Sequence, residues 1–513
     1  MQNYSKSKKH SLTLIFSAFI AGLCSIIYEL LIATTTSYFL GDSVKYFSLT
    51  IGIYMAAMGL GSFVSKYITQ DIVRSFVIIE ISLGVLGGMS IPFLYFSYAY
   101  TDLFIWFYLF FTILIGFLIG LEIPFLTRLM ESYHKLNINI ANILSFDYLG
   151  ALIATISFPF LLLPLFGIYQ SSLIFGLINM SIGFVVLWAF KDQISGCRRL
   201  TISAILSTIL LLLMILSSNV MLSHWDNQLY ADRIIFSEQS KYQKIILTKD
   251  RDDIRLFLDG NLQFSSLDEY RYHESLIHIP IALHNRPIKN VLLLGAGDGL
   301  AIRELLKYPE IENITLIDLD KTIIDLAKEN RYVSQLNEQS LDSPKLSIVI
   351  ADAFTYLKDN KQVFDFIICD LPDPNNTVLS RLYSKQFYKL LKMRLGYNGV
   401  LVTQATSPYF ATKAFWSIKK TISSAGFSSV LPYHTEIPSF GDWGFILASN
   451  SGIKAVSDIK INVPTKFLDQ NNYQKLFVFD KDIIAEESEL EINMLDKPAL
   501  LQYYLDGWSR YSY

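Results

Sequence analysis

The sequence predicts a multi-span α-helical membrane domain followed by an α/β Rossmann-like domain that carries a small N-terminal β subdomain. Charged residues nearly vanish between residues 11 and 222, which is the pattern of membrane-spanning helices. Strand and helix patterns alternate after residue 284, as in a parallel, doubly wound sheet. We therefore divide the 513 residues into four parts, 1–222, 223–283, 284–450 and a C-terminal tail, 451–513.

The composition agrees with this division and excludes some classes of protein. The chain is 52% hydrophobic and 17% charged, which is too apolar for a purely soluble enzyme. A net charge of −3 argues against nucleic acid as a partner. Cys24, Cys197 and Cys369 lie far apart, so no pair has the spacing of a metal site or a disulfide framework.

Apolar runs predict seven membrane-spanning helices in the first 222 residues. Each run is long enough to cross roughly 30 Å of hydrocarbon as a helix. The runs are 11–33, 46–66, 75–97, 103–126, 145–165, 168–190 and 201–222. The first is too long for a cleaved signal peptide, and more spans follow it.

The distribution of Lys and Arg predicts a multi-pass protein of the cell membrane with a cytoplasmic N-terminus. Loops on the side of the N-terminal tail are rich in Lys and Arg, whereas the opposite loops carry only Lys45. Seven spans would place the residues after 222 outside the cell. We nevertheless expect them in the cytoplasm, where their cofactor would be found, so that one span would have to be re-entrant or miscounted.

Four acidic residues fall within or at the ends of the predicted spans: Glu29, Glu80, Glu122 and Asp147. A charge inside a bilayer is costly, so such residues are often functional. One interpretation places them near helix ends or in pairs within the bundle. The other makes them a path or a sensing pocket for cations.

Residues 223–283 predict the small β subdomain and a helix that links it to the next domain. YQKIILTK, IRLFLDG and NLQFS have the pattern of short strands, with Asp259 and Gly260 as a hairpin turn. DEYRYHESLIHIPIALH then predicts a helix.

Residues 284–450 predict the doubly wound sheet. The expected strands are 291–295, 314–318, 346–350, 364–370 and 398–404, and the expected helices are 299–307, 321–330, 353–358, 384–393 and 411–425. Ligands of such sheets bind beyond the carboxyl ends of the strands. The functional residues are therefore expected at those ends.

The loop after the first strand predicts a site for an adenosine-type cofactor. Gly295, Gly297 and Gly299 let the backbone approach a ligand closely. Asp318 ends the next strand and is placed to accept hydrogen bonds from ribose hydroxyls. This pattern leaves NAD, S-adenosylmethionine and related compounds open. Asp352, which precedes Ala353 after the third strand, either binds the adenine amino group or caps a helix.

Three acids predict a strongly negative rim. Asp370 ends the fourth strand, Asp373 follows it between two prolines, and Asp298 lies in the glycine loop. Such a rim suits a substrate with several positive charges, such as a diamine. It disfavours a cofactor that carries a carboxylate beside Asp298. S-adenosylmethionine has that carboxylate, whereas its decarboxylated form has only an ammonium group.

Residues 235–450 resemble a spermidine synthase, and the whole chain is similar to the membrane-attached polyamine aminopropyltransferases. The stretches that carry the resemblance are YQKI, LFLDGNLQ, DEYRYHESLIHIP, VLLLGAGDG, LIDLD, IVIADAF, IICDLPDP, LYSKQFY and IPSFGDWGF. The resemblance implies a class I methyltransferase-like Rossmann fold, a membrane protein and a possible homo-oligomer. It also implies transfer of an aminopropyl group from decarboxylated S-adenosylmethionine to putrescine, giving spermidine and methylthioadenosine.

The resemblance further implies a role for each site residue. Asp370 would be the general base that takes a proton from the attacking amine, and Asp373 would bind the diamine. Asp298 and His273 would bind amino groups of the aminopropyl chain and the polyamine. The methylthioadenosine part would contact Gln243, Asp318, Asp352 and Ala353. The sulfonium is already a good leaving group, so the resemblance implies neither a metal nor a tightly bound cofactor.

The sequence departs from the family pattern in several places. Asp318 replaces the usual glutamate, and GAG replaces a loop with two leading glycines. NNT at 375–377 replaces the usual GP after the catalytic acids, and Phe440 stands where a tyrosine is often found near the diamine. The last two changes concern the choice of acceptor amine more than the chemistry. We expect Tyr272 and Trp443 to serve packing rather than chemistry.

Two other functions are compatible with parts of the pattern. A methyltransferase that uses S-adenosylmethionine itself would share the fold and the glycine loop, but the acids at Asp298, Asp370 and Asp373 count against it. A non-catalytic membrane transporter or sensor of polyamines would share the apolar half and the acidic pocket. The intact Asp370 counts against that alternative.

Overall fold

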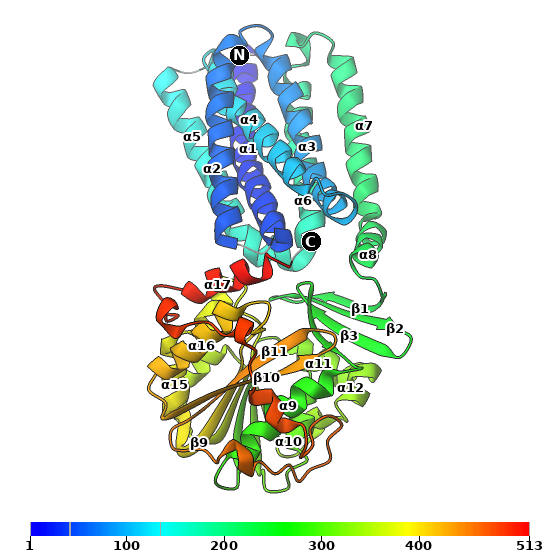
Figure 1. The fold of residues 1–513 in the computed structure, drawn as a ribbon. Helices are drawn as coiled ribbons and strands as arrows, with labels where there is room; N and C mark the ends of the chain where they lie inside the picture. Colours follow the sequence, from blue (N-terminus) through cyan, green and yellow to red (C-terminus); the bar gives the residue numbers. More distant parts are fainter. Residues whose placement is uncertain (1, 41–42, 134, 512–513) are drawn as a thin grey trace. The chain divides into compact units, whose positions relative to one another are not determined.

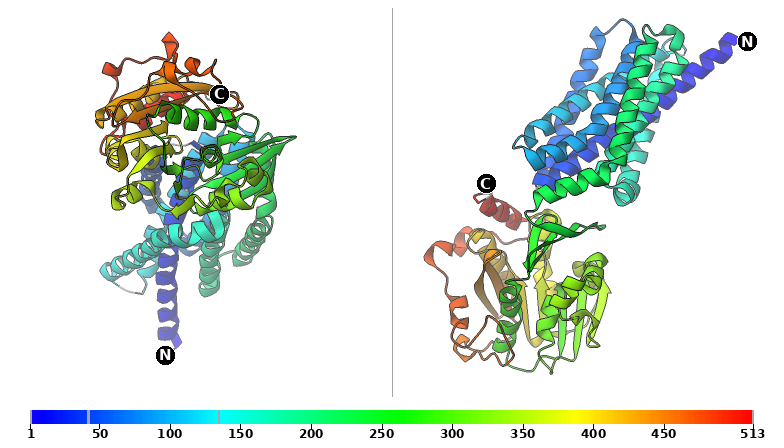
Figure 2. Two further views of the ribbon diagram at one scale, coloured as in Figure 1. Left: turned by 90° about the horizontal axis from the view of Figure 1, so that it is seen from below. Right: turned by 90° about the vertical axis from the view of Figure 1, so that its right-hand side faces the viewer.

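The computed structural model describes residues 2–40, 43–133 and 135–511 (Figure 1). The chain divides into two compact units, Met1–Ala231 and Asp232–Tyr513, which Figure 2 shows from two further directions. The first unit extends past residue 222, the predicted boundary, because its last helix continues to Leu229.

The first unit is helical. Its long helices are α1 (Gln2–Leu40), α2 (Ser43–Val64), α3 (Ile72–Tyr100), α4 (Phe104–Met130), α5 (Leu136–Ser157), α6 (Leu163–Ala189) and α7 (Cys197–Leu216). The shorter elements are η1 (Ser65–Tyr67), η2 (Phe158–Leu162), η3 (Lys191–Gln193) and α8 (Ser218–Leu229). Each of the seven predicted spans overlaps a helix of this unit.

By length and composition, six of the described helices could cross a membrane. One of them, Leu136–Ala189, runs through α5, η2 and α6. It is broken at Gly167, whose φ of 67° and ψ of −178° are not helical. The predicted spans 145–165 and 168–190 lie on either side of this break. Counting Leu136–Ala189 as one helix gives six, whereas dividing it at Gly167 gives the predicted seven.

Small residues let the helices of the first unit pack backbone to backbone. A Cβ atom built on Gly120 of α4 would lie 2.1 Å from the carbonyl oxygen of Met58 on α2. A Cβ atom on Gly150 of α5 would lie 2.1 Å from the carbonyl oxygen of Phe19 on α1. Such close approach is typical of helices that associate in a bilayer.

Two of the four acids lie deep in this bundle. The side chains of Glu80 and Glu122 are 0% and 2% exposed. Asn179 of α6 donates from Nδ2 to Glu80 Oε2 at 2.9 Å and to the Glu80 carbonyl at 3.0 Å. Glu29 and Asp147 are only partly buried. This geometry agrees with the interpretation that Glu80 has a partner inside the bundle. The cation path stays a prediction.

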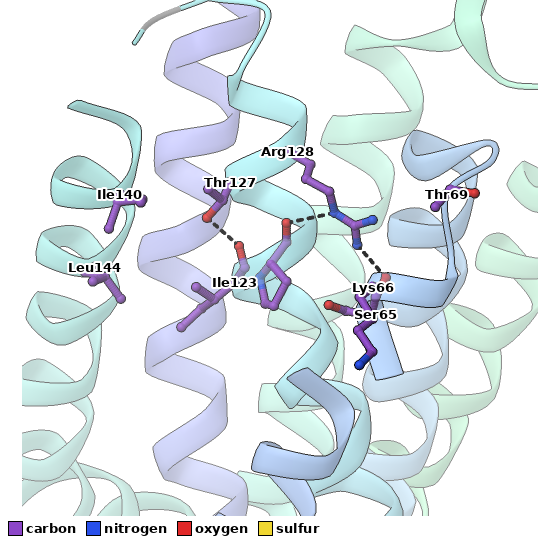
Figure 3. A pocket seen from close by; sticks show the side chains of 9 residues that line it. Ser65, Lys66, Thr69, Ile123, Thr127, Arg128, Ile140 and Leu144 are labelled. Carbon is purple, nitrogen blue, oxygen red and sulfur yellow. Dashed lines mark hydrogen bonds between the residues drawn. The ribbon is translucent and has the colours of Figure 1, made fainter. Parts of the chain in front are cut away.

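A pocket in the first unit lies between η1, α4 and α5 (Figure 3). The guanidinium of Arg128 donates to the carbonyl oxygens of Ile68 at 2.8 Å and Ser65 at 2.9 Å. Its Nε donates to the carbonyl of Pro124 at 3.3 Å. Arg128 thus binds backbone carbonyls at η1 and just after it, and its hydrogen bonds hold η1 against α4.

The second unit begins with a four-stranded antiparallel sheet in the order β1-β2-β3-β4. The strands are β1 (Arg233–Gln239), β2 (Lys244–Asp250), β3 (Asp253–Leu258) and β4 (Asn261–Ser265). Asp259 and Gly260 have φ values of 47° and 80°, which a two-residue hairpin turn requires. The helix α9 (Glu269–Leu283) follows, as predicted. The sequence analysis missed β1.

The larger sheet has seven strands in the order β10-β11-β9-β8-β5-β6-β7. They are β5 (Asn290–Gly295), β6 (Asn313–Asp318), β7 (Leu346–Ile350), β8 (Phe364–Asp370), β9 (Leu395–Gln404), β10 (Ser429–Ile437) and β11 (Gly441–Ser449). The five predicted strands are present and parallel.

The prediction of an entirely parallel sheet is wrong, because β11 runs antiparallel to β9 and pairs with β10 as a hairpin. The sequence analysis missed these two strands. Pro432 lies within β10 and lacks the donor that a central strand needs. It is tolerated because β10 is the edge of the sheet.

Helices cover both faces of this sheet (Figure 1). After α9, the α-helices of this unit are α10 (Leu300–Leu305), α11 (Lys321–Glu329), α12 (Arg331–Leu336), α13 (Ala353–Asp359), α14 (Thr377–Ser380), α15 (Lys385–Arg394), α16 (Thr412–Ser424) and α17 (Ala499–Trp508). Successive residues of β5 alternate between two cores: Leu293 packs in the core that contains α9, and Leu292 in the core that contains Phe387 of α15. The carboxyl ends of the parallel strands are therefore held in fixed register.

Candidate active site at the carboxyl ends of the strands

The glycine loop fits tightly between two strand ends. Gly295 and Gly299 have φ values of 80° and 82°, which favour glycine. A Cβ atom on Gly295 would lie 2.0 Å from the carbonyl oxygen of Asp370, and one on Gly297 would lie 2.6 Å from Asp318 Oδ2. The loop therefore needs glycine at these positions, and it brings the ends of β6 and β8 to one place.

Asp298 is fixed within this loop. Its Oδ1 accepts a hydrogen bond from the amide of Leu300 at 2.9 Å, and its carbonyl accepts one from Asn337 Nδ2 at 2.8 Å. Burial raises the pKa of Asp298, although the positive charge of His273 lowers it. The acid predicted to select the cofactor is thus held rigidly and only partly exposed.

Asp318 lies beside a second acid that the sequence analysis missed. Asp318 Oδ1 accepts from the amide of Asp320 at 2.9 Å, and burial raises the pKa of Asp318 to about 6. Asp320 caps α11 through Thr322 and accepts from Gln243 Nε2 at 3.1 Å. Gln243 therefore joins the small β subdomain to the loop after β6. The second Asp of LIDLD was the available signal, because an acid before a helix pattern is a common N-cap.

Asp352 serves as a helix cap in this structure. Its Oδ1 accepts from the amide of Thr355 at 3.0 Å and from the Thr355 hydroxyl at 2.8 Å. Its Oδ2 pairs with Arg381 Nη2 at 2.5 Å. Ala353 begins α13 and is 8% exposed. The capping alternative is thus realised, and a contact of Asp352 or Ala353 with adenine stays a prediction.

Asp370 contacts the hydroxyl of Tyr272. The Tyr272 hydroxyl of α9 donates to Asp370 Oδ1. Its ring packs in the core as predicted, so Tyr272 has a contact in the site in addition to its packing role. Burial raises the pKa of Asp370 to about 6, and the charge of Asp298 adds to the rise. The positive charge of His273 and the Tyr272 hydrogen bond act in the opposite direction. The expected base is therefore ionised at neutral pH but more basic than an exposed aspartate.

His273 is a buried imidazolium. It is 3% exposed, and its Nδ1 lies 2.8 Å from Glu269 Oε2 and 2.8 Å from the Glu269 carbonyl. Burial alone would lower the pKa of His273. The hydrogen bond and charge of Glu269, together with Asp298 and Asp370, raise it to about 9. An imidazolium donates hydrogen bonds and cannot accept one from an amine, so the predicted amine-binding role would require the neutral form.

Glu269 is itself fixed by Arg303. The two guanidinium nitrogens Nη1 and Nη2 donate to the two oxygens of Glu269, each at 2.9 Å. The pair is buried, and a bidentate pair of this kind is strong and directional. The sequence analysis missed both residues, because each occupies an ordinary position in a predicted helix.

Asp373 accepts hydrogen bonds from two neutral side chains. Gln404 Nε2 donates to Oδ1 at 3.2 Å and the Thr406 hydroxyl to Oδ2 at 3.1 Å. Burial raises the pKa of Asp373 to about 6, whereas Gln404, Tyr504 and Thr406 lower it. Neither hydrogen-bond donor was predicted from the sequence.

The segment after the two acids is anchored on the end of β8. The side chain of Asn376, from the unusual NNT stretch, caps α14 through the amide of Leu379 at 2.8 Å. The hydroxyl of Tyr383 contacts the carbonyl oxygens of Leu371 at 3.1 Å and Pro372 at 3.0 Å. Phe440, which lacks a hydroxyl, packs against Trp443 with ring centroids 5.4 Å apart.

The site therefore has a centre and two sides. Asp298, Asp370 and His273 influence one another's pKa values at the centre. Asp318 lies on one side with Asp320, and Asp373 on the other. Among the described residues, no group of three or more His, Cys, Asp or Glu side chains could hold a metal ion. The centre can accept a proton, and the acids can bind ammonium groups.

Comparisons with known proteins agree with this geometry. Residues 269–459 match the family model described as the spermine/spermidine synthase domain. The chain is 41% identical to a polyamine aminopropyltransferase of Leptospira interrogans, over 97% of this chain and 99% of that protein. It is 40% identical to one of Oceanobacillus iheyensis, over 99% of both chains. The similarity therefore includes the apolar helices as well as the site.

Solved structures also match about half of the chain. A spermidine synthase in complex with the transition state analogue AdoDATO has 30% identity and a TM-score of 0.45, covering 48% of this chain and 86% of that one. The spermidine synthase of Thermotoga maritima has 30% identity and a TM-score of 0.44, covering 48% and 85%.

Proposed function

We propose that this chain, which belongs to the polyamine aminopropyltransferase family, transfers the aminopropyl group of its co-substrate, decarboxylated S-adenosylmethionine, to putrescine. The products are spermidine and methylthioadenosine. The observation that carries the choice of a diamine is the pair of acids at the end of β8. Asp370 and Asp373 are both aspartates with raised pKa values, yet they are held by different partners. Two such acids can serve the two ends of a diamine, one as base and one as anchor.

The reaction is a displacement at the carbon next to the sulfonium. A neutral amine nitrogen of the acceptor forms the new C–N bond, the C–S bond breaks, and its electron pair stays on the sulfur of methylthioadenosine. The amine loses one proton, which Asp370 accepts. Burial makes Asp370 a stronger base, and the hydroxyl of Tyr272 holds its Oδ1 in place. The rest of the rate enhancement comes from positioning the two reactants.

The glycine loop and Asp318 fit the nucleoside part of the co-substrate. The position of a Cβ at Gly297 falls 2.6 Å from Asp318 Oδ2, so a side chain there would obstruct the acid expected to bind the ribose. Asp298 would attract the ammonium end of the aminopropyl chain and repel a carboxylate in its place. That difference favours the decarboxylated co-substrate over S-adenosylmethionine and argues against methyl transfer.

Asp373 would bind the second amino group of the acceptor. Its hydrogen-bond donors, Gln404 and Thr406, are neutral, so they do not cancel the negative charge of the carboxylate. A protonated amine is the natural partner of such a carboxylate. The departures at 375–377 and Phe440 lie in the same acceptor region by resemblance, so the acceptor has to be measured.

We also propose that the first unit crosses the cell membrane with the N-terminus and the enzyme unit in the cytoplasm. Its helices are long and apolar, and large apolar side chains face outward, including Trp188 at 78% and Leu216 at 81% exposed. Exposed apolar surface of this extent is typical of a protein in contact with lipid. The supply of decarboxylated S-adenosylmethionine in the cytoplasm supports that side for the enzyme unit.

The test of the proposed function is a product assay on the purified full chain in detergent. Decarboxylated S-adenosylmethionine is supplied with putrescine, cadaverine or spermidine, and methylthioadenosine and the larger polyamine are measured. We expect the highest kcat/KM with putrescine, and a loss of roughly 10²-fold or more in Asp370→Asn. Equal or better turnover with another amine would contradict putrescine as the acceptor. Full activity of Asp370→Asn would contradict its role as the base.

A further inference from the structure

A buried arginine lies behind the candidate site, and the chemistry at Asp370 gives it no direct part. Arg303 belongs to α10, the helix that follows the glycine loop, and its backbone amide donates to the carbonyl of Gly299 at 3.0 Å. Its side chain is almost completely removed from solvent. Both ends of the guanidinium fork donate to the carboxylate of Glu269. Arg303 therefore ties the helix of the glycine loop to α9.

Glu269 connects Arg303 to the imidazole of His273. The two residues are one turn apart on α9, and His273 Nδ1 lies 2.8 Å from both Glu269 Oε2 and the Glu269 carbonyl oxygen. Two contacts on one ring nitrogen fix the position and the tilt of the ring. The ring of Tyr272, whose hydroxyl donates to Asp370, lies beside it with centroids 5.1 Å apart. The place of Arg303 therefore determines how the imidazole lies beside the proposed base.

A second set of contacts joins Arg303 to the glycine loop. Its Nη1 also donates to the carbonyl of Leu336, at the end of α12, at 2.7 Å. The next residue, Asn337, is fully buried and donates from Nδ2 to the carbonyl of Asp298 at 2.8 Å. Arg303 therefore lies between Asp298 and His273, the two residues expected to bind amino groups of the aminopropyl chain and the polyamine.

The cluster is held rigidly from its far side as well. Arg303 Nε donates to Glu304 Oε1 at 2.9 Å. The other oxygen of Glu304 lies 2.8 Å from His278 Nε2 and 2.6 Å from Lys307 Nζ. A lysine in place of Arg303 would keep the positive charge, but its single nitrogen cannot reproduce the planar fork on Glu269. The geometry of the guanidinium can thus be tested apart from its charge.

Glu269 also supports the positive charge of His273. Burial lowers the pKa of His273, whereas the hydrogen bond and charge of Glu269, together with Asp298 and Asp370, raise it to about 9. These three acids are the charged groups that act on the imidazole from α9, the glycine loop and the end of β8. Loss of the carboxylate of Glu269 should therefore leave the imidazole neutral over more of the pH range.

We propose that Arg303 is a positioning residue for aminopropyl transfer: through its two hydrogen bonds to Glu269, it fixes the imidazole of His273 beside Asp370. This inference rests on the proposed function, because it takes Asp370 to be the base of that reaction. Arg303 acts on the reaction through His273, so its effect on turnover depends on the presence of that imidazole. A role in folding alone has no such dependence.

The test is a double-mutant cycle of Arg303→Lys and His273→Gln in the full chain in detergent. With putrescine and decarboxylated S-adenosylmethionine at saturation, we expect Arg303→Lys to lower kcat about tenfold, the usual effect of losing a hydrogen bond between charged groups. In the His273→Gln background the same change should alter kcat by less than about twofold, because residues that act through one group are not additive. Lys307→Gln is the control, since Lys307 pairs with Glu304 and should leave kcat unchanged.

Glu269→Gln gives a second measurement, which decides the matter if Arg303→Lys does not fold. Without the carboxylate, the pKa of His273 should fall, and the imidazole should lose the charge that lowers the pKa of Asp370. The acidic limb of the kcat/KM profile should therefore move to higher pH. Adding His273→Gln to Glu269→Gln should move it no further. A limb that stays in place in Glu269→Gln would overturn the inference.

The outcomes distinguish failure of this inference from failure of the proposed function. An equal loss of kcat with and without His273, or a lower melting temperature with an unchanged kcat, would mean that Arg303 only stabilises the fold. If the unmodified chain then still makes spermidine and Asp370→Asn does not, the proposed function stands and the role of Arg303 is wrong. If the unmodified chain makes no spermidine, both proposals fall.

Discussion

The chemistry of the proposed base depends on opposing influences on one carboxylate. Burial and the charge of Asp298 raise the pKa of Asp370 to about 6, whereas His273 and Tyr272 lower it. Without the two lowering influences the carboxylate would hold its proton to higher pH and could not accept one from the amine. The imidazolium of His273 therefore keeps the base ionised at neutral pH, which is a role different from binding an amine.

The pH dependence of turnover tests this view of Asp370. The base must be ionised, so kcat/KM should rise with pH along the acidic limb of its pH profile, with an apparent pKa of about 6. This apparent pKa belongs to the interacting acids as a group and not to one residue. Replacing His273 by Gln removes the positive charge that lowers the pKa of Asp370. The limb should then move to higher pH.

A suitable control for this shift is His434→Gln. His434 is also bonded to an acid, Asp442, at 2.6 Å, but the groups that act on its pKa are Asp442, Val478 and Asp480 rather than the site acids. Its loss should leave the limb in place. A limb that stays unchanged in His273→Gln, or moves to lower pH, would contradict the role given to the imidazolium.

The sequence predicted the acids of the site but not the residues that orient them. Asp298, Asp318, Asp370 and Asp373 follow apolar strands, which is a local pattern that can be read directly. Tyr272 looks like any other residue on the face of a helix, and its contact with Asp370 depends on how α9 packs. Gln404 ends a later strand and Thr406 follows it, and only the tertiary fold brings them to Asp373.

At the scale of elements, the glycine loop between β5 and α10 is the part of the site that we propose fits the co-substrate. The loop is predictable because its glycines are required by backbone geometry, with positive φ at Gly295 and Gly299. The β10–β11 hairpin was not predictable in the same way. Its strands have mixed polarity, and Pro432 breaks the expected pattern, because an edge strand needs hydrogen bonds on one side only.

Gly297→Ala tests the loop directly. The new Cβ would lie 2.6 Å from Asp318 Oδ2, so Asp318 would have to move from the place where it is expected to bind the ribose. We expect the KM for decarboxylated S-adenosylmethionine to rise about tenfold or more, with a nearly unchanged KM for putrescine. Gly452→Ala is the control, because no atom lies within 4 Å of the Cβ position there. An unchanged co-substrate KM in Gly297→Ala would contradict the assignment of this loop.

At the scale of the whole molecule, the chain joins an apolar helical unit to an enzyme unit. The length of the apolar runs predicted the helices of the first unit well, because each run is long enough to form a helix that spans a bilayer. It did not decide how the chain turns at Gly167, where one continuous apolar stretch of 54 residues contains a break in the helix. The number of crossings, and hence the side of the enzyme unit, depends on such local geometry.

The proposed orientation can be measured with reporters fused after Tyr513. An enzyme reporter that is active only in the cytoplasm should give a signal, and one that is active only outside the cytoplasm should not. The same pair fused after Lys45, which lies in the first turn of α2, should give the reverse result. A C-terminal fusion that is active only outside would contradict a cytoplasmic enzyme unit and would agree with seven crossings.

The central claim is that the acidic rim selects a decarboxylated co-substrate and delivers its aminopropyl group to a diamine. The most direct measurement is the mass of the products when the full chain is given putrescine with either S-adenosylmethionine or its decarboxylated form. We predict methylthioadenosine and spermidine from the decarboxylated form, and no transfer from S-adenosylmethionine. In Asp298→Asn the preference between the two co-substrates should weaken. Methylated putrescine with S-adenosylhomocysteine, and no spermidine, would contradict the account.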